Sequence, residues 1–467
     1  MNAFNDGGSD AKLSPRQVFK GYNPAGIVTL AVSGGGDSVA LLLLAHGWSQ
    51  IAEVTLHAVT VDHGLRPEAA AEAAFVASLC EGLGIDHTTL GWEGLKPFSG
   101  VAEAARRARY NLIAEFATAI GSDLILTAPT ADAQAETVFM RLMRETGMAA
   151  GEADAEGGRE PVSLGRGMAG MSRLSMLAEG LMLGRPLLGT SRAGLRAYLA
   201  SVPQGWVEDP TNEDTSYERV RVRKALAGDP LQRERLIRFS RVMGDMRAVL
   251  ARDTARLLGE SVSVLPGPVF QFEVGRGMPV ARPVHIFALQ VLVALAGGGE
   301  HLAPRGQVEP LLAWRARREP AKTTIGGAVI EKTGAGYRLY REMRNLESLD
   351  IEPGESLVWD GRLEITNNGR DAVHVGPLSR AGLERLERDR QDRIAAHPRA
   401  ALISTALLRT GGKHALPMVE SGVGSGAVAC RVTSQAIEQF CPQSDFPVLD
   451  WLRELDAARR ACLLPRP

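Results

Sequence analysis

The chain has 467 residues, enough for two or three domains, and its apolar content of 45% suits ordinary globular cores. Its formal net charge is −1, so no overall positive charge would draw it to a nucleic acid. Any contact with RNA must therefore come from local basic patches. The four cysteines are scattered without a C-x-x-C pair, which argues against a disulfide framework, a zinc ribbon or a persulfide-carrying cysteine pair.

The N-terminal sequence has no basic region followed by an apolar run, so it predicts no signal peptide. No apolar stretch approaches the roughly 20 residues that a membrane-spanning helix requires. We therefore expect a cytoplasmic protein that does not associate with a membrane.

After an expected N-terminal tail (residues 1–24), strand and helix patterns alternate as far as residue 227. The predicted strands are 27–32, 54–61, 87–90 and 123–128. The predicted helices are 38–48, 68–82 and 101–120. This alternation predicts an α/β fold, a doubly wound parallel sheet with helices on both faces, whose ligands bind at the carboxyl ends of the strands.

The rest of the chain has other patterns. Residues 149–184 are rich in Gly, Met and Ser and predict a mobile insertion. Residues 228–320 predict a mostly helical middle domain, with Leu231 to Leu258 as its longest helix and an interruption between Pro266 and Pro283. Residues 321–467 predict a small α+β C-terminal domain, in which 328–341 forms a hairpin, 358–365 continues in β structure and 379–393 forms a solvated helix.

The most informative segment is the glycine-rich turn between the first strand and the first helix, A-V-S-G-G-G-D-S at residues 31–38. Glycines let backbone N–H groups approach an anion closely, and the helix that follows presents unpaired N–H groups and the positive end of its dipole. Asp37 beside phosphates would require a cation, which predicts Mg²⁺ at this residue. The turn lacks the lysine of a Walker loop and the third glycine of a dinucleotide fingerprint.

This loop, Ser33, Gly34, Gly35, Gly36, Asp37 and Ser38, resembles the pyrophosphate loop of the N-type ATP pyrophosphatases. Further segments, in this order and spacing, extend the resemblance to the tRNA(Ile)-lysidine synthetases. They are V-D-H-G-L-R at 61–66, G-V-A-E-A-A-R-R-A-R-Y at 100–110, Q-A-E-T-V-F-M-R-L-M-R-E-T-G at 134–147, R-P-L-L at 185–188, W-V-E-D-P-T-N at 206–212 and R-V-R-V-R at 219–223. The resemblance is strong over residues 25–225, and a weaker one extends over 320–365.

The resemblance implies a two-step reaction on the wobble cytidine of a tRNA(Ile) with a CAU anticodon. ATP adenylates the C2 oxygen of the base and releases pyrophosphate. The ε-amine of free L-lysine then attacks C2 and displaces AMP, which gives lysidine. The middle and C-terminal domains are implied to bind tRNA. The resemblance leaves open whether two copies form a homodimer.

The resemblance also implies roles for individual residues. The loop from Ser33 to Ser38 would hold the pyrophosphate, and Asp62, His63 and Gly64 would lie near the adenine and ribose. Asp37, Arg106, Asp132 and Glu136 are the catalytic candidates. Arg106 and Arg109 lie three residues apart, so a helix would place them on one face. Without the resemblance, Asp62 to Gly64 also fits an exposed turn, the two arginines fit a solvated helix, and Glu136 fits a purely structural role at a helix start.

One segment departs from the family pattern. The usual pattern of the family at this place resembles A-H-H-x-[DN]-D-Q-x-E-T. This chain reads A-P-T-A-D-A-Q-A-E-T at 128–137. Pro129 and Thr130 replace the two histidines, and Ala133 replaces the acid to which the family assigns a role in magnesium binding. Asp132 precedes it by one residue, which on a helix means a rotation of about 100°. Asp132 could therefore replace the lost acid only if the local backbone shifts.

A basic cluster follows this catalytic region. Arg219, Arg221, Arg223 and Lys224 suit an RNA backbone, and a strand-like alternation would place the three arginines on one face. An ordinary exposed basic strand or helix is the alternative.

Two other functions compete with the ligase. A tRNA thiolase of the same class would use C-x-x-C pairs, which this chain lacks. A catalytically impaired paralogue that binds tRNA or nucleotide is favoured by the changes at Pro129, Thr130 and Ala133.

Overall fold

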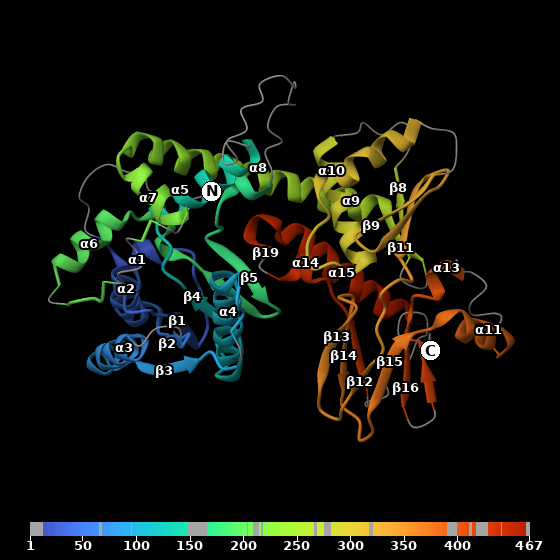
Figure 1. Cartoon of the computed structure of the whole chain (residues 1–467), viewed down its shortest axis with the longest axis horizontal. Helices are drawn as coiled ribbons and strands as arrows, with labels where there is room; N and C mark the ends of the chain where they lie inside the picture. Colours follow the sequence, from blue (N-terminus) through green and yellow to red (C-terminus); the bar gives the residue numbers. More distant parts are fainter. Residues whose placement is uncertain are drawn as a thin grey trace. The chain divides into compact units, whose positions relative to one another are not determined.

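The structure is a computed structural model of the whole chain (Figure 1). It describes residues 13–64, 68–94, 96–146, 166–202, 204–208, 214–215, 218–265, 269–274, 282–316, 321–389, 399–410, 413–416, 428–439 and 441–463. Residues 1–12 of the expected tail, residues 149–165 of the expected insertion and the D-P-T-N part of the W-V-E-D-P-T-N segment lie outside the described residues. The tail prediction is wrong over residues 13–24, because Val18, Phe19 and Tyr22 are apolar side chains buried in the core of the first unit.

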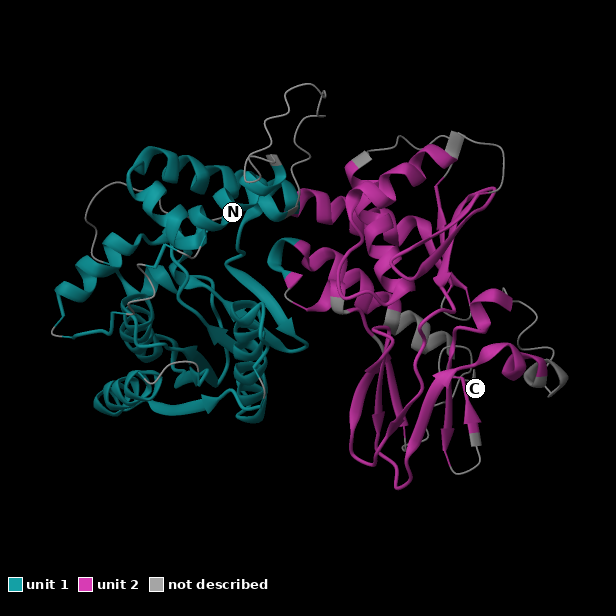
Figure 2. Ribbon diagram, viewed as in Figure 1, with its two compact units in different colours: residues 1–247, 442–444 teal, residues 248–441, 445–467 magenta. Residues whose placement is uncertain are grey.

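The chain divides into two compact units (Figure 2). The first consists of residues 1–247 and 442–444, and the second of residues 248–441 and 445–467. The division falls within the long helix α8 (Pro230–Ser261). The boundaries expected at 227/228 and 320/321 stay predictions.

A mainly parallel sheet forms the centre of the first unit. Its strands are β1 (Ile27–Ala31), β2 (Thr55–Asp62), β3 (Asp86–Gly91), β4 (Leu124–Leu126), β5 (Leu174–Ala178) and β6 (Leu181–Gly184). The short strand β19 (Cys441–Pro442) joins them, and the order is β19-β5-β6-β4-β1-β2-β3. The neighbours from β6 to β3 are parallel, and β5 pairs antiparallel with β6. The predicted doubly wound α/β fold is confirmed, as are the four predicted strands.

The β5–β6 hairpin corrects one expectation. Residues 174–184 were assigned to a mobile insertion, but they form two strands that extend the sheet. The apolar runs on both sides of the turn at Gly180, which has a φ of +74°, carry enough apolar area to join the core. Leu177, Leu181 and Leu183 are buried there.

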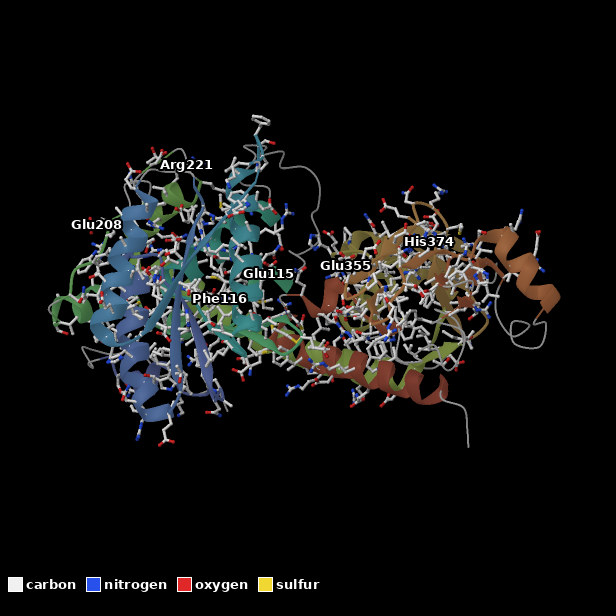
Figure 3. All side chains as sticks on the ribbon, turned by 90° about the horizontal axis from the view of Figure 1, so that it is seen from below. Glu115, Phe116, Glu208, Arg221, Glu355 and His374 are labelled. Atoms are coloured by element: carbon white, nitrogen blue, oxygen red, sulfur yellow. The ribbon has the colours of Figure 1, made fainter. Side chains whose placement is uncertain are left out.

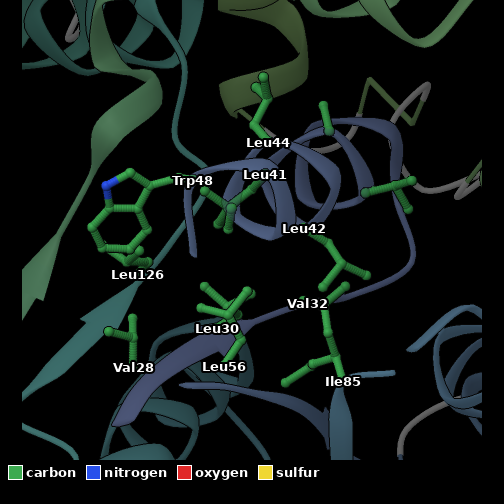
Figure 4. Packing of buried hydrophobic residues seen from close by; sticks show 14 of the residues in the cluster. Val28, Leu30, Val32, Leu41, Leu42, Leu44, Trp48, Leu56, Ile85 and Leu126 are labelled. Carbon is green, nitrogen blue, oxygen red and sulfur yellow. The ribbon is translucent and has the colours of Figure 1, made fainter. Parts of the chain in front are cut away.

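Helices cover both faces of this sheet. The short helix α1 is Pro15–Val18; the longer ones are α2 (Gly36–Ala52), α3 (Ala69–Leu83) and α4 (Val101–Ala119). Side chains of α2 and α3 pack with Val28, Leu30 and Leu126 on one face (Figure 4). Side chains of α4 pack with Val59 and Ile125 on the other. Successive strand residues thus point to opposite faces, as expected for a sheet buried on both sides.

Besides α8 and the 3₁₀ turn η2 (Arg166–Ala169), the first unit contains further helical segments that surround the site. They are α5 (Ala131–Thr146), the 3₁₀ turn η3 (Pro186–Gly189), α6 (Arg192–Ala200) and α7 (Glu218–Ala227). Ala135 and Val138 of α5 pack with Leu226 of α7 and Leu236 of α8. The strand-like alternation predicted for 219–223 is therefore wrong. Leu226 and Val222 supply the apolar side of a helix that packs on α5.

The second unit contains antiparallel sheets. One has the order β7-β8-β11-β10-β9, and α9 (Arg282–Gly297) packs on it. Its strands are β7 (Val262–Leu265), β8 (Val269–Glu273), β9 (Lys322–Ile325), β10 (Ala328–Lys332) and β11 (Gly336–Arg341). The predicted hairpin at 328–341 is confirmed by the antiparallel pairing of β10 with β11. The mostly helical character expected for 228–320 is incomplete, because β7 and β8 lie within it.

The remaining sheets of this unit are smaller. One has the order β12-β15-β16-β17 and the other the order β13-β14-β18. Their strands are β12 (Leu349–Ile351), β13 (Ser356–Trp359), β14 (Leu363–Asn367), β15 (Val373–Pro377), β16 (Ala406–Thr410), β17 (Lys413–Ala415) and β18 (Val428–Val432). The other helices of the unit are α10 (Arg305–Val308), η5 (Glu309–Ala316), α11 (Ser379–Asp389), α13 (Arg399–Leu402), α14 (Gln435–Glu438) and α15 (Phe446–Leu463). Within the described residues, no helix is both long and apolar enough to cross a membrane.

Candidate functional site

The glycine-rich turn has the geometry that its sequence predicts. It links the end of β1 to the start of α2 at Gly36, and Gly34 takes a φ of +84°, which favours glycine. The Ser38 hydroxyl donates to the Gly35 carbonyl oxygen at 2.8 Å and accepts from the Ser33 N–H at 3.2 Å. The loop is therefore closed on itself, and the positive end of the α2 dipole lies at it.

A later segment of the chain lies against this loop. The Val207 N–H donates to the Gly34 carbonyl oxygen at 3.0 Å. A Cβ added at Gly36 would lie 3.4 Å from the Trp206 ring, so a side chain there would press on the indole. Trp206 and Val207 belong to a segment that carries the family resemblance. Their contacts with Gly34 and Gly36 of the loop could not be predicted from the sequence.

Asp37 lies in the first turn of α2, and its carboxylate is 3.4 Å from Nε of Arg192 at the start of α6. Burial raises the pKa of Asp37 above its ordinary value, although the Arg192 guanidinium acts in the opposite direction. A half-buried carboxylate whose charged form is disfavoured in this way would be stabilised by a cation in the loop.

Glu136 of α5 is almost completely buried, with 1% of its side chain exposed. It forms ion pairs with Arg192 at 2.8 Å, Arg219 at 2.9 Å and Arg223 at 3.2 Å. Burial alone would raise its pKa, but Arg192 and Arg219 outweigh that effect and hold the pKa below the ordinary value. Glu136 therefore remains charged and connects α5 with α6 and α7.

Asp132 uses both of its carboxylate oxygens. One accepts from the backbone N–H of Arg192 at 2.7 Å, and the other accepts from the Arg233 guanidinium of α8 at 2.9 Å. These two contacts connect the start of α5 with the start of α6 and with α8. Asp132 thus has a structural task in this arrangement, and its charge also raises the pKa of Asp37. That Asp132 replaces the lost acid stays a prediction.

Arg192 therefore joins three of the four predicted catalytic residues, Asp37, Asp132 and Glu136. Sequence reasoning missed it. The only available signal was its place four residues after the R-P-L-L segment, directly after Ser191, whose side chain caps α6. No described contact connects the fourth predicted catalytic residue, Arg106, to this group.

The structure explains Thr130 better than the sequence did. Its side chain is fully buried, and its hydroxyl accepts from the Ala133 N–H at 3.3 Å at the start of α5. It therefore acts as the N-cap of that helix. Ala133 is also buried, with 5% exposed, and supplies no polar group.

A second group surrounds the end of β2. The Asp62 carboxylate accepts from the Gly64 N–H at 2.8 Å, and His63 Nε2 accepts from the Arg109 guanidinium at 3.1 Å. Burial lowers the pKa of His63, and the positive charge of Arg109 is the next largest cause in the same direction. Arg106 instead lies over the Tyr110 ring, 5.0 Å from its centroid. Of the two arginines predicted to share a face, Arg109 is the one that contacts the predicted nucleotide residues.

The predicted RNA-binding cations separate into two groups because α7 is a helix. Arg219 and Arg223 are four residues apart and both face Glu136. Arg221, which is labelled in Figure 3, is exposed, and so is Lys224; the helical spacing places both away from the face of Arg219 and Arg223. The Arg221 guanidinium donates to the Thr215 carbonyl oxygen at 2.8 Å.

The donors at the loop suit a phosphate chain with one hard cation. Mg²⁺ commonly binds through one or two carboxylates together with substrate phosphates, so a dedicated cluster of acids is not required. Among the described residues, no group of three or more His, Cys, Asp or Glu side chains could hold a metal ion. Asp37 lies in the loop itself, and the charge of Asp132 is close enough to raise the pKa of Asp37.

Comparison with known proteins gives two results. Residues 11–229 match the family model of the PP-loop domain. A tRNA(Ile)-lysidine synthase of Mesorhizobium japonicum is 37% identical over 434 residues, which cover 92% of each chain. A tRNA(Ile)-lysidine synthase of Brucella suis is 36% identical over 453 residues, which cover 93% of this chain and 96% of the relative.

Proposed function

Because the chain belongs to the tRNA(Ile)-lysidine synthase family, we propose that it attaches free lysine to C2 of the wobble cytidine of tRNA(Ile) at the expense of ATP. The observation that carries the proposal is the closed glycine loop between β1 and α2, with Asp37 beside it, in a chain that matches these relatives over most of its length. The reaction is a ligation that forms a C–N bond and releases AMP and pyrophosphate.

Each part of the site has a task in this reaction. The loop from Ser33 to Ser38 binds the pyrophosphate part of ATP, and Asp37 holds Mg²⁺ beside it. When bound, Mg²⁺ neutralises charge on the leaving pyrophosphate. Asp62, His63 and Gly64 bind the adenosine part.

Glu136 and its three arginines hold the surrounding helices in place. Together with their neighbours they form a charged cluster that sets the electrostatic potential at the loop. The cluster contains one more cation than anions: Arg192, Arg219, Arg223 and Arg233 against Asp37, Asp132 and Glu136. Arg192 is the cation of this cluster that forms an ion pair with Asp37. It is therefore the guanidinium best placed to contact a phosphate beside the loop. The remaining partners, a tRNA with a CAU anticodon and free L-lysine in the cytoplasm, belong to the same proposal.

The test is the release of AMP from ATP and Mg²⁺ by the purified protein. Release should require both a CAU-anticodon tRNA(Ile) transcript and free lysine. The elongator tRNA(Met), which also has a CAU anticodon, is the control and should not support release. AMP release that is independent of tRNA would contradict the proposal.

The rate of this reaction depends on the changed segment. Ala133 brings no carboxylate to the loop, Pro129 brings no imidazole, and Asp132 is occupied by Arg192 and Arg233. These observations favour a slow enzyme over a fast one, and they are what supports the impaired paralogue as the second candidate. Binding of ATP and tRNA without lysine transfer would decide for that candidate.

A further inference from the structure

The connection between β3 and α4 is fixed beside the predicted nucleotide residues. Trp92 directly follows β3, and its N–H donates to the Asp62 carbonyl oxygen at 2.8 Å. This extends the β2–β3 pairing by one step beyond the pair Asp62 and Gly91. Trp92 therefore lies at the carboxyl edge of the sheet, where ligands of such folds bind.

Two side chains hold the Trp92 ring. The Lys96 ammonium lies 4.3 Å from the ring centroid and also donates to the Trp92 carbonyl oxygen. The His63 ring meets the indole edge-on, with 5.9 Å between centroids and 87° between planes. Since Arg109 donates to His63, the loop is connected to α4 as well as to β2.

Phe98 lies two residues after Lys96 and is completely exposed, with a relative exposure of 108%. The other exposed large apolar side chains of the described chain expose between 37% and 57%. A loop that is anchored at Trp92, at the carboxyl edge of the sheet, thus presents one aromatic ring entirely to solvent.

The sequence around this ring is basic. Between residues 92 and 110 the sequence has four cations, Lys96, Arg106, Arg107 and Arg109, against two acids, Glu93 and Glu103, in a chain whose net charge is −1. Arg106 and Arg107 are exposed near the start of α4. An exposed aromatic ring with neighbouring cations matches an unpaired nucleotide strand, which offers base faces for stacking and phosphates for ion pairing.

We propose that Phe98 is a stacking platform for an unpaired base of the tRNA anticodon loop, next to the cytidine that reacts, and that Arg107 meets the adjoining phosphate. The proposal rests on the proposed function, because it names the part of the tRNA that reaches this edge of the sheet. Lys96 and Trp92 are positioning residues that hold the loop.

The first experiment measures binding of an anticodon stem-loop RNA with a CAU loop, without ATP or lysine. Phe98→Ala should weaken binding by about tenfold or more, the usual cost of losing one base–aromatic stack. Phe98→Tyr should retain most of the affinity, because a phenol ring also stacks. Ile51→Ala is the matched control: it removes another exposed apolar side chain, at the opposite end of α2, and should leave binding unchanged. Equal affinities for all four proteins would overturn the proposal.

The second experiment places a benzophenone side chain at position 98 in the full chain. Irradiation with tRNA(Ile) should give a crosslink to an anticodon-loop nucleotide. A crosslink to a second copy of the chain, or to the acceptor stem, would refute the assignment. Neither experiment requires catalysis, so the two proposals can fail separately: lysidine formation with unchanged RNA binding by Phe98→Ala would reject the platform alone, whereas a specific crosslink without lysidine would reject the reaction alone.

Discussion

At the scale of single residues, Asp37 is the side chain on which ATP use depends most directly. Asp37→Ala should abolish Mg²⁺-dependent ATP binding, because it removes the carboxylate in the first turn of α2, directly at the glycine loop. The fold should remain intact, since 35% of this side chain is exposed and its one ion pair is long. Calorimetric titration with ATP and Mg²⁺ measures the first effect and thermal unfolding the second. An unchanged ATP affinity would remove Asp37 from the metal site.

Glu136→Gln should destabilise the protein at neutral pH, by about 3–5 kcal/mol if it behaves like other broken buried ion pairs. The folded-state pKa of Glu136 is below the ordinary value of 4.5, so its stabilising effect is complete above that pH and is lost as the pH falls through the lowered value. Urea unfolding as a function of pH should therefore show the parent and the variant converging in acid. Parallel curves at all pH values would contradict the assigned ion pairs.

Restoring the family pattern at two positions should raise turnover. Pro129→His with Ala133→Asp returns an imidazole and a carboxylate, which contribute on the order of 10²–10⁴ in rate each and not additively. Thr130 should be left unchanged, because it is fully buried and caps α5. Single-turnover kinetics of lysine transfer measure the gain, and thermal unfolding checks that the buried aspartate is tolerated. High activity of the parent, with no gain on restoration, would show that another group fulfils the role.

At the scale of elements, α7 separates two kinds of arginine. Arg221→Ala with Lys224→Ala should weaken tRNA binding and reduce its salt dependence by about one unit for each lost phosphate contact, with stability unchanged. Arg219→Ala with Arg223→Ala should instead lower stability, because both side chains pair with buried Glu136. Lys20→Ala, an exposed cation at the end of α1, is the control for a general charge effect. An identical salt slope for the first double variant and the parent would place the tRNA contacts elsewhere.

The elements also show what can be predicted from the sequence. The glycine loop is readable because its geometry depends on residues within a span of six, and the β1, β2 and α2 patterns are strongly apolar. The helix α7 was misread because R-V-R-V-R alternates like a strand, whereas Leu226 and the packing on α5 decide its structure. The ion pairs of Arg192 with Asp37 and Glu136 could not be predicted from the sequence. They join residues 155 and 56 positions apart, and no local sequence pattern indicates such contacts.

At the scale of the whole molecule, the near-neutral charge restricts how RNA can be bound. Local basic patches must supply the attraction, because the net charge of −1 provides none, and we propose α4 and α7 as two of them. The family relatives, one of which covers 92% of the chain, support the proposed reaction, and we expect the segment 128–137 to limit its rate.

Mass analysis of the nucleosides of tRNA(Ile), after incubation with the protein, ATP, Mg²⁺ and isotope-labelled lysine, tests the central claim most directly. The account predicts lysidine that carries the label, at the wobble position alone, and none when ATP is omitted or Asp37 is replaced by Ala. An unmodified wobble cytidine after prolonged incubation, both with the parent and with the Pro129→His and Ala133→Asp variant, would contradict it.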